Sequence, residues 1–122
     1  MNTSFDFSGK TALVTGGVSG IGAAASLAFK RAGANVIACG VTAQELMAAT
    51  ANPAFADIRI EALDVRDDAA VRRLIGGLPR LDFVVNSAGI IRRGAEHDPA
   101  TFAEVIDVNL NGGMRVATAA HP

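Results

Sequence analysis

Short apolar runs alternate with stretches of helical periodicity along the chain, and this alternation most limits the folds open to it. The apolar runs are Thr11–Thr15, Val36–Cys39, Ile58–Val65 and Leu81–Val85. The helical stretches begin near Ile21, Thr42, Asp67 and Asp98. Near-continuous apolar strands separated by helices are typical of a parallel sheet that is covered on both faces. We therefore predict an α/β fold with a doubly wound parallel sheet and right-handed crossovers.

Residues suited to helix ends mark the boundaries of these stretches. Gly33 follows the first helix at the position that favours a left-handed turn. Thr42 and Glu45 form a capping-box pattern, with the acid three residues after the threonine. Asp67 is placed to cap the third helix. Asp98-Pro99, an N-cap followed by proline, opens a long helix that we expect to continue through Ala120.

The composition limits the classes of partner. The chain has 122 residues and a net charge of −1, which suits one domain over residues 1–122 and gives no basic surface for nucleic acid. Its single cysteine, Cys39, excludes an internal disulfide and leaves no metal cage, so we expect it to pack as a small apolar residue. Asp6 stands where a signal peptide would need basic charge, and no apolar run is long enough to cross a membrane. We expect a cytoplasmic protein.

The strongest motif is TGGVSGIG, Thr15 to Gly22, between the first strand and the first helix. A diphosphate must approach the backbone closely, and glycine leaves room for it. The first turn of the helix then offers free N–H groups and the positive end of its dipole to the anion. This position after a strand and before a helix favours a phosphate site over a glycine-rich loop without a ligand.

Four motifs in order resemble those of the short-chain dehydrogenase/reductase family. They are Thr15-Gly16-x-x-x-Gly20-x-Gly22, Leu63-Asp64-Val65, Asn86-Ser87-Ala88-Gly89 and Asp107-Val108-Asn109-Leu110. The third differs from the family's NNAG by a serine at its second position. The resemblance covers nearly the whole chain and implies a Rossmann-type fold, the 3-2-1-4 portion of a 3-2-1-4-5-6-7 sheet. It also implies an NAD(P)-dependent oxidoreductase that transfers hydride between nicotinamide and an alcohol or ketone.

The resemblance also implies the residues of the cofactor site. Asp64 would bond the adenine amino group, and Gly89 would let the backbone pass close to the ribose. The expected cofactor-binding residues are Gly16, Val18, Ser19, Gly20, Ile21, Gly22, Gly40, Val41, Asp64, Val65, Asn86, Ala88, Gly89 and Ile90.

Asn109 is the expected catalytic residue, because it matches the family's catalytic asparagine. Helical spacing places it on one face with Phe102, Val105, Ile106 and Val116, so its amide is expected to be buried and to need partners. One interpretation is that the amide bonds to neighbouring backbone groups. The resemblance implies another: Asn109 kinks the helix, and its backbone holds a water in a proton relay. The Gly112-Gly113 pair would ease such a distortion.

The family's other catalytic residues include a tyrosine and a lysine four residues after it, and neither can be mapped onto this sequence. The chain contains no tyrosine and no lysine after Lys30. We therefore expect the N-terminal half of a longer enzyme, inactive by itself, with Leu81–Val85 left as an apolar edge strand. The alternative is a catalytically dead nucleotide-binding or dimerisation module from a truncated paralogue.

The choice between NAD and NADP is left open by the residues. Gly40-Val41-Thr42 stands where NAD enzymes carry an acid for the ribose 2′-OH. The family's basic positions for a 2′-phosphate hold Ser19 and Val41. An uncompensated phosphate is harder to hold than an unsatisfied hydroxyl, which favours NAD slightly.

The expected partners follow from the resemblance. They are a small alcohol or carbonyl substrate and further copies of the chain, as a homodimer or homotetramer through the Asp98–Ala120 helix. His97, in the loop before that helix, is expected to be exposed rather than catalytic. A response-regulator receiver is an alternative that the sequence disfavours. Receivers need an acidic pair after the first strand to hold Mg²⁺, and Gly16-Gly17 stands at that position.

Overall fold

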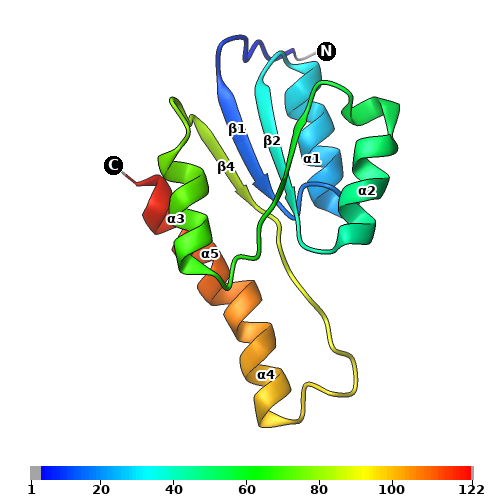
Figure 1. Cartoon of the computed structure of the whole chain (residues 1–122), viewed down its shortest axis with the longest axis vertical. Helices are drawn as coiled ribbons and strands as arrows, with labels where there is room; N and C mark the ends of the chain where they lie inside the picture. Colours follow the sequence, from blue (N-terminus) through cyan, green and yellow to red (C-terminus); the bar gives the residue numbers. More distant parts are fainter. Residues whose placement is uncertain (1–3, 122) are drawn as a thin grey trace.

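A computed structural model describes residues 4–121 of the chain. Four parallel strands alternate with helices (Figure 1). The strands are β1 (Thr11–Thr15), β2 (Asn35–Gly40), β3 (Arg59–Ala62) and β4 (Phe83–Asn86). The helices are α1 (Gly20–Arg31), α2 (Ala43–Ala51), α3 (Asp68–Gly76), α4 (Pro99–Ile106) and α5 (Gly112–Ala120), with a 3₁₀ turn at Pro53–Phe55 and a π-helical segment at Asp107–Asn111.

The strand order is β3-β2-β1-β4, and all neighbours are parallel. Leu13 of β1 pairs with Ile37 of β2 on one side and with Val84 of β4 on the other. This confirms the predicted doubly wound sheet. Helices α1 and α2 lie on one face of the sheet, and α3 and α5 lie on the other (Figure 1).

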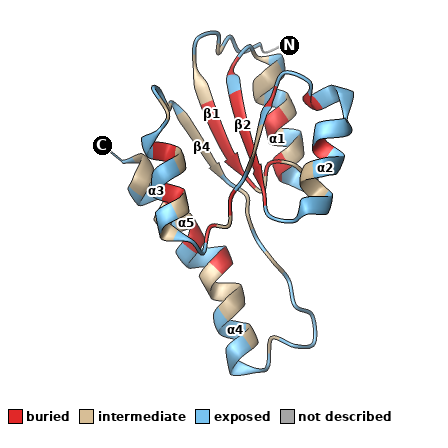
Figure 2. Cartoon of the chain, in the orientation of Figure 1, coloured by how far each residue is buried: buried red, intermediate tan, exposed pale blue. Residues whose placement is uncertain are grey.

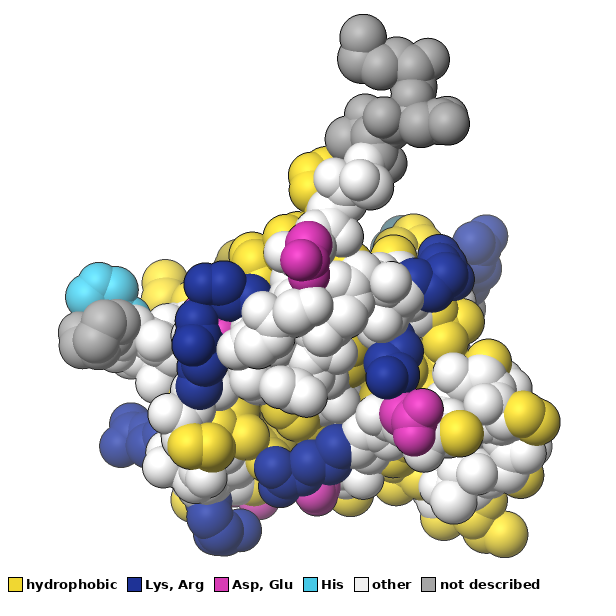
Figure 3. Space-filling view, turned by 90° about the horizontal axis from the view of Figure 1, so that it is seen from above, with side chains coloured by type: hydrophobic (Ala, Val, Ile, Leu, Met, Phe, Trp, Pro, Cys, Tyr) yellow, Lys and Arg dark blue, Asp and Glu magenta, His cyan; other side chains and the backbone are white. Residues whose placement is uncertain are grey.

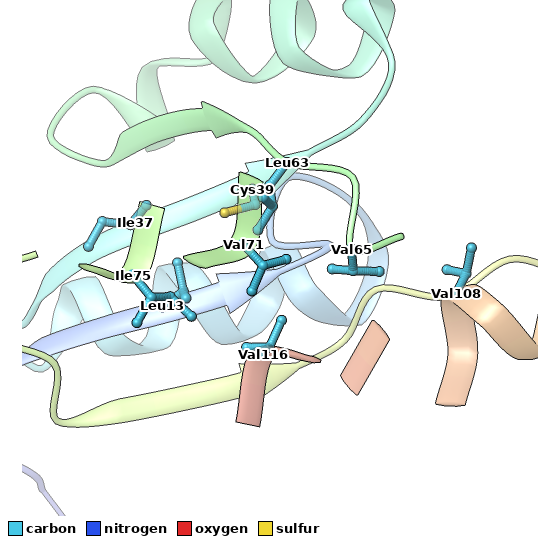
Figure 4. Close-up of a cluster of buried hydrophobic side chains, with 9 residues drawn as sticks. All are labelled: Leu13, Ile37, Cys39, Leu63, Val65, Val71, Ile75, Val108 and Val116. Atoms are coloured by element: carbon cyan, nitrogen blue, oxygen red, sulfur yellow. The ribbon is translucent and has the colours of Figure 1, made fainter. Parts of the chain in front are cut away.

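Alternate residues of the strands build two separate cores. Val14, Val36 and Ala38 pack with the apolar side of α1 and with Phe55. The second core lies against α3 and α5 and consists of Leu13, Ile37, Cys39, Leu63, Val65, Val71, Ile75, Val108 and Val116 (Figure 4). Burial from water raises the pKa of the Cys39 thiol to about 12, which keeps it protonated and packed as an apolar group.

The predicted helix ends agree with the structure. Thr42 and Glu45 make a complete capping box, with both reciprocal hydrogen bonds present. Asp67 accepts from the Ala70 N–H, and Asp98 accepts from the Thr101 N–H. Gly33 adopts φ +95° immediately after Ala32, the C-cap of α1, so the left-handed turn lies where the glycine predicts it.

β2 extends one residue beyond each end of the predicted run Val36–Cys39, and two strands begin later than predicted. The apolar run Ile58–Val65 forms a strand only over Arg59–Ala62, because β2, its partner, ends at Gly40. The Leu63 N–H still donates to the Gly40 carbonyl, at 2.9 Å, and the chain then turns toward α3. β4 begins two residues later than the run Leu81–Val85 suggested.

The long helix predicted from Asp98 to Ala120 is interrupted, and its expected buried face is confirmed at Val116 but wrong at Phe102 and Asn109. The π-helical segment separates α4 from α5. Asn109 is exposed and Phe102 is 55% exposed, whereas Val108 is buried. The extra residue of a π turn shifts the helical phase, which a uniform 3.6-residue period does not anticipate. Figure 2 shows α4 projecting from the sheet, and none of its residues is buried.

Charge is dispersed over the face of the molecule seen in Figure 3. Lys and Arg side chains lie apart from one another on this face, between apolar and polar groups. None of the helices in residues 4–121 is both long and apolar enough to cross a bilayer. Within the same residues, no three His, Cys, Asp or Glu side chains gather as a metal site.

Asp82 joins the start of β1 to β4 and makes the fold sensitive to acid. Its carboxylate accepts from Arg80 Nε at 2.7 Å and from the Thr11 N–H at 2.8 Å. These bonds, the Arg80 side chain foremost, lower the pKa of Asp82 from 3.8 to about 2. A carboxyl group with a depressed folded-state pKa stabilises the fold above its unfolded pKa, and this contribution is lost as pH falls from about 4 to about 2.

We therefore expect Asp82→Asn to lower the urea midpoint at pH 5 and to narrow the difference between the midpoints at pH 5 and pH 2. Asp57→Asn is the matched control. The Asp57 side chain is 79% exposed, and its ion pair with Lys30 is long, at 3.9 Å, so it contributes little to stability. Equal pH dependence in both variants would contradict the role of Asp82.

Candidate functional site

A cavity of about 700 Å³ lies at the carboxyl ends of the strands. Ligands of doubly wound sheets bind at this edge. The lining residues are Gly16, Ser19, Gly20, Ile21, Gly40, Val41, Thr42, Glu45, Asp64, Val65, Arg66, Ser87, Ala88, Gly89, Ile90, Ile91, Arg92, Glu104 and Val108. Most of the predicted cofactor residues are thus brought together. Three of them, Val18, Gly22 and Asn86, lie outside the lining, as does Asn109, the predicted catalytic residue.

The glycines of the first turn are needed for its shape. Gly16 adopts φ +58°, and a Cβ there would lie 2.9 Å from the Ala88 backbone. A Cβ on Gly22 would lie 1.9 Å from the Gly16 carbonyl oxygen. Gly20 adopts φ +54° and faces open space, with nothing within 4 Å of an added Cβ. The turn is therefore packed closely from behind and open toward the cavity.

The first turn of α1 differs from those of α2, α3 and α4, which carry side-chain caps. Its N-cap residue, Ser19, makes no side-chain cap hydrogen bond, and the first turn holds no acidic residue. Thr42, Asp67 and Asp98 cap the other three helices. Ser19, Gly20 and Ile21 all line the cavity, so these amides and the positive end of the helix dipole suit an anion bound there.

Thr15 ties this turn to the end of β4. Its hydroxyl, in a residue only 1% exposed, accepts from the N–H groups of Ser87 and Ala88, each at 3.2 Å. The same hydroxyl lies 3.4 Å from the Val85 carbonyl oxygen, to which it donates. Thr15 therefore sets the position of two cavity-lining residues, although it does not line the cavity itself.

Asn86 and Asn109 hold neighbouring backbone. Asn86 Nδ2 donates to the Gly113 carbonyl at 3.4 Å, which joins the end of β4 to α5. Asn109 Oδ1 accepts from the Ile90 N–H at 2.8 Å, and its Nδ2 donates to the Ile90 carbonyl at 3.0 Å. The amide of Asn109 is thus satisfied by backbone, and the helix around it has the local distortion that the resemblance implied.

Asp64 lies just past β3 and is paired with a neighbour. Arg66 donates to its two carboxylate oxygens, with Nη2 2.7 Å from Oδ2. This bond to the Arg66 side chain lowers the pKa of Asp64 below its usual 3.8. Glu104 of α4 lies 3.4 Å from both Arg66 and Arg92, so an ion-pair chain crosses the cavity wall.

Several exposed apolar side chains surround the cavity. Ile21, Val41 and Ile91 line it, and their exposed fractions are 85%, 54% and 65%. Exposed apolar groups around a concave polar site are typical of a surface that a ligand covers. Together with the open glycine and the uncapped helix, they fit a ligand that has both an anionic and a flat apolar part.

Eight lining residues are not among the predicted cofactor-binding residues: Thr42, Glu45, Arg66, Ser87, Ile91, Arg92, Glu104 and Val108. Thr42 and Ser87 belong to segments that the sequence places at the cofactor, whereas the capping-box pattern identifies Glu45 only as part of a helix start. Arg66 directly follows the Leu63-Asp64-Val65 motif, so its position in the sequence could have indicated it. Arg92 and Glu104 could be found only from the fold, because no local pattern joins them to Asp64.

Comparison with known proteins agrees with this geometry. The short chain dehydrogenase family profile matches residues 10–122. The peroxisomal hydratase-dehydrogenase-epimerase of Neurospora crassa is 38% identical over 120 residues, which cover 96% of this chain and 13% of that protein. The 2,3-dihydro-2,3-dihydroxybenzoate dehydrogenase of Escherichia coli is 37% identical over 119 residues, 91% of this chain and 44% of that protein.

Solved structures show the same arrangement. A short-chain type dehydrogenase/reductase from Mycobacterium ulcerans superposes with a TM-score of 0.84 at 29% identity. The match covers 95% of this chain and 46% of that one. The chain thus spans less than half the length of each of these three relatives.

Proposed function

Because the chain belongs to the short-chain dehydrogenase family, we propose that its cavity binds a nicotinamide dinucleotide and serves an oxidoreductase. The observation that carries this proposal is the uncapped first turn of α1, which opens into a cavity of about 700 Å³ beside Gly16 and Gly20. A diphosphate would take the free N–H groups of that turn.

Other residues of the chain would position the rest of the cofactor. Asp64 would accept from the adenine amino group, for which its carboxylate is kept ionised by Arg66. The Ala88–Ile90 segment would lie along the nicotinamide-side ribose, and Asn109 holds that segment through both backbone groups of Ile90. When bound, the nicotinamide would donate or accept the hydride.

The substrate proposed for the whole protein is a secondary alcohol or the corresponding ketone. The similarity to an Escherichia coli dehydrogenase whose name gives a dihydroxylated ring compound favours this class. These 122 residues contain no tyrosine. The proposal for the chain itself is therefore cofactor binding, with Asn109 and the Ile90 loop as the part of the active site that it contributes.

We also propose self-association through α4 and α5. Phe102 of α4, Leu110 of the π-helical segment and Met114 of α5 are 55%, 64% and 67% exposed. A second copy of the chain would cover this face, and size-exclusion chromatography with light scattering measures the resulting mass.

The cofactor proposal is tested by Gly20→Ala. Gly20 is open to the cavity, so a Cβ there would stand in the space proposed for the diphosphate. We expect NAD(H) and NADP(H) to bind at least tenfold more weakly in calorimetric titrations, about 1.4 kcal/mol of lost binding free energy. Alanine at this positive φ should also lower the free energy of unfolding, separately from its effect on cofactor binding.

Gly9→Ala is the matched control. Gly9 also has a positive φ, +79°, with nothing within 4 Å of an added Cβ, but it lies away from the cavity. This variant should lose a similar amount of stability and keep its affinity. If the unsubstituted chain binds neither cofactor, or if both variants bind equally well, the proposed site is wrong.

A further inference from the structure

The cavity wall where β2 meets α2 carries a carboxylate at its edge. Gly40, Val41, Thr42 and Glu45 all line this part of the cavity. A Cβ on Gly40 would lie 2.6 Å from Val18 Cγ2 and 3.1 Å from Glu45 Oε1. The end of β2 therefore has no room for an acidic side chain of its own, and the nearest acid comes from the first turn of α2.

The Glu45 carboxylate is held in place by the backbone. Its Oε1 accepts from the Val41 N–H at 2.5 Å and from the Thr42 N–H at 3.1 Å. The Thr42 hydroxyl accepts from the Glu45 N–H at 3.1 Å, which fixes the base of the same side chain. Both bonds to the carboxylate fall on Oε1, and among the hydrogen bonds of residues 4–121 none reaches Oε2. One carboxylate oxygen thus remains available to a ligand.

The same bonds take up the groups that a second phosphate would need. The N–H groups of Val41 and Thr42, at the start of α2, would otherwise attract an anion. The cationic residues that line the cavity are Arg66 and Arg92, and both are engaged by carboxylates, Arg66 by Asp64 and both by Glu104. A phosphate beside Glu45 would therefore meet a like charge without a free cation among the lining residues.

We propose that Glu45 selects the cofactor: its carboxylate accepts a hydrogen bond from the adenosine ribose 2′-hydroxyl and repels a 2′-phosphate, so the site takes NAD(H) in preference to NADP(H). The inference rests on the proposed function. It places the discriminating acid on α2, five residues beyond the end of β2, where Gly40 leaves the space for it. A ribose hydroxyl is a hydrogen-bond donor, which suits the free Oε2 of Glu45. A phosphate at neutral pH is negatively charged, so the Glu45 carboxylate would repel it.

The test compares NAD⁺ and NADP⁺ binding by calorimetry in the unsubstituted chain and in Glu45→Gln. We expect the unsubstituted chain to bind NAD⁺ at least tenfold more tightly. Glutamine keeps an oxygen that can accept the two N–H bonds, so the capping box and the fold are retained. Removal of the charge should reduce the NAD⁺ preference about tenfold, mainly through tighter NADP⁺ binding. A thermal melt followed by circular dichroism checks that the variant is folded.

Glu96→Gln is the matched control. It removes the same charge from a side chain that accepts from the Arg92 N–H and lies outside the cavity lining. This variant should keep the preference of the unsubstituted chain. An unsubstituted chain that binds NADP⁺ as tightly as NAD⁺, or equal changes in the two variants, would overturn the role of Glu45 alone. Binding of neither cofactor would overturn the proposed function and this inference with it.

Discussion

Replacing Gly22 with alanine is expected to lower the free energy of unfolding by about 3 kcal/mol. The new Cβ would lie 1.9 Å from the carbonyl oxygen of Gly16 and 2.7 Å from its carbonyl carbon. Both are backbone atoms, so no side-chain rotation can relieve the contact. The first turn of α1 would have to move away from the end of β1, and the glycine turn that faces the cavity would move with it.

Urea denaturation at pH 7 measures this loss, and Gly76→Ala is its control. Gly76 ends α3, is exposed and has nothing within 4 Å of an added Cβ. Alanine there should leave stability unchanged or raise it by up to about 1 kcal/mol, because alanine favours the helix. A Gly22→Ala chain as stable as the Gly76→Ala chain would show that the turn does not need such close packing.

Thr15→Val has the second largest expected effect. Valine nearly matches the shape of threonine but offers no acceptor to the N–H groups of Ser87 and Ala88, which now lie 3.2 Å from the hydroxyl. An unsatisfied buried donor costs about 1–3 kcal/mol, and these two donors are partly buried, so we expect a loss of about 2 kcal/mol. The Ser87–Ala88 backbone would also lose its fixed distance from the glycine turn, which should weaken cofactor binding.

Thr15→Ser separates the hydroxyl from the methyl group. Serine keeps the acceptor and loses one buried methyl, which costs about 1 kcal/mol. Its urea midpoint should therefore lie between those of the unsubstituted chain and Thr15→Val, and its cofactor affinity should be unchanged. If valine, which keeps the methyl group, destabilises less than serine, the packing of that methyl group matters more at this position than the pair of hydrogen bonds.

The sheet and its turns could be predicted because their determinants are local. The apolar runs indicated four strands, and Thr42, Asp67 and Asp98 marked helix starts that carry the expected caps. The order β3-β2-β1-β4 came from the family resemblance, and it agrees with the structure. The glycine turn was equally accessible, since a close backbone approach restricts the residue type at each of its positions.

Features that depend on residues far apart in the chain could not be predicted. Glu104 contacts Arg66, 38 residues away, and no periodicity signals that pairing. Asn109 was expected to be buried by helical spacing, but it is exposed and bonds to Ile90 across the cavity loop. In both cases the partner is set by how α4 leaves the sheet, which no local pattern contains.

The widened turn at Asp107–Asn111 has a consequence for the whole helical rod formed by α4 and α5. One additional residue in a turn advances every later side chain by about 100° around the axis. Val108, Gly112 and Val116 are spaced four residues apart and are all buried, whereas Phe102 of α4 is exposed to water. Removing a single residue from this turn would therefore rotate α4 by more than a quarter of a circle relative to α5. Glu104 would then turn away from both arginines, with the amino-acid composition of the two helices almost unchanged.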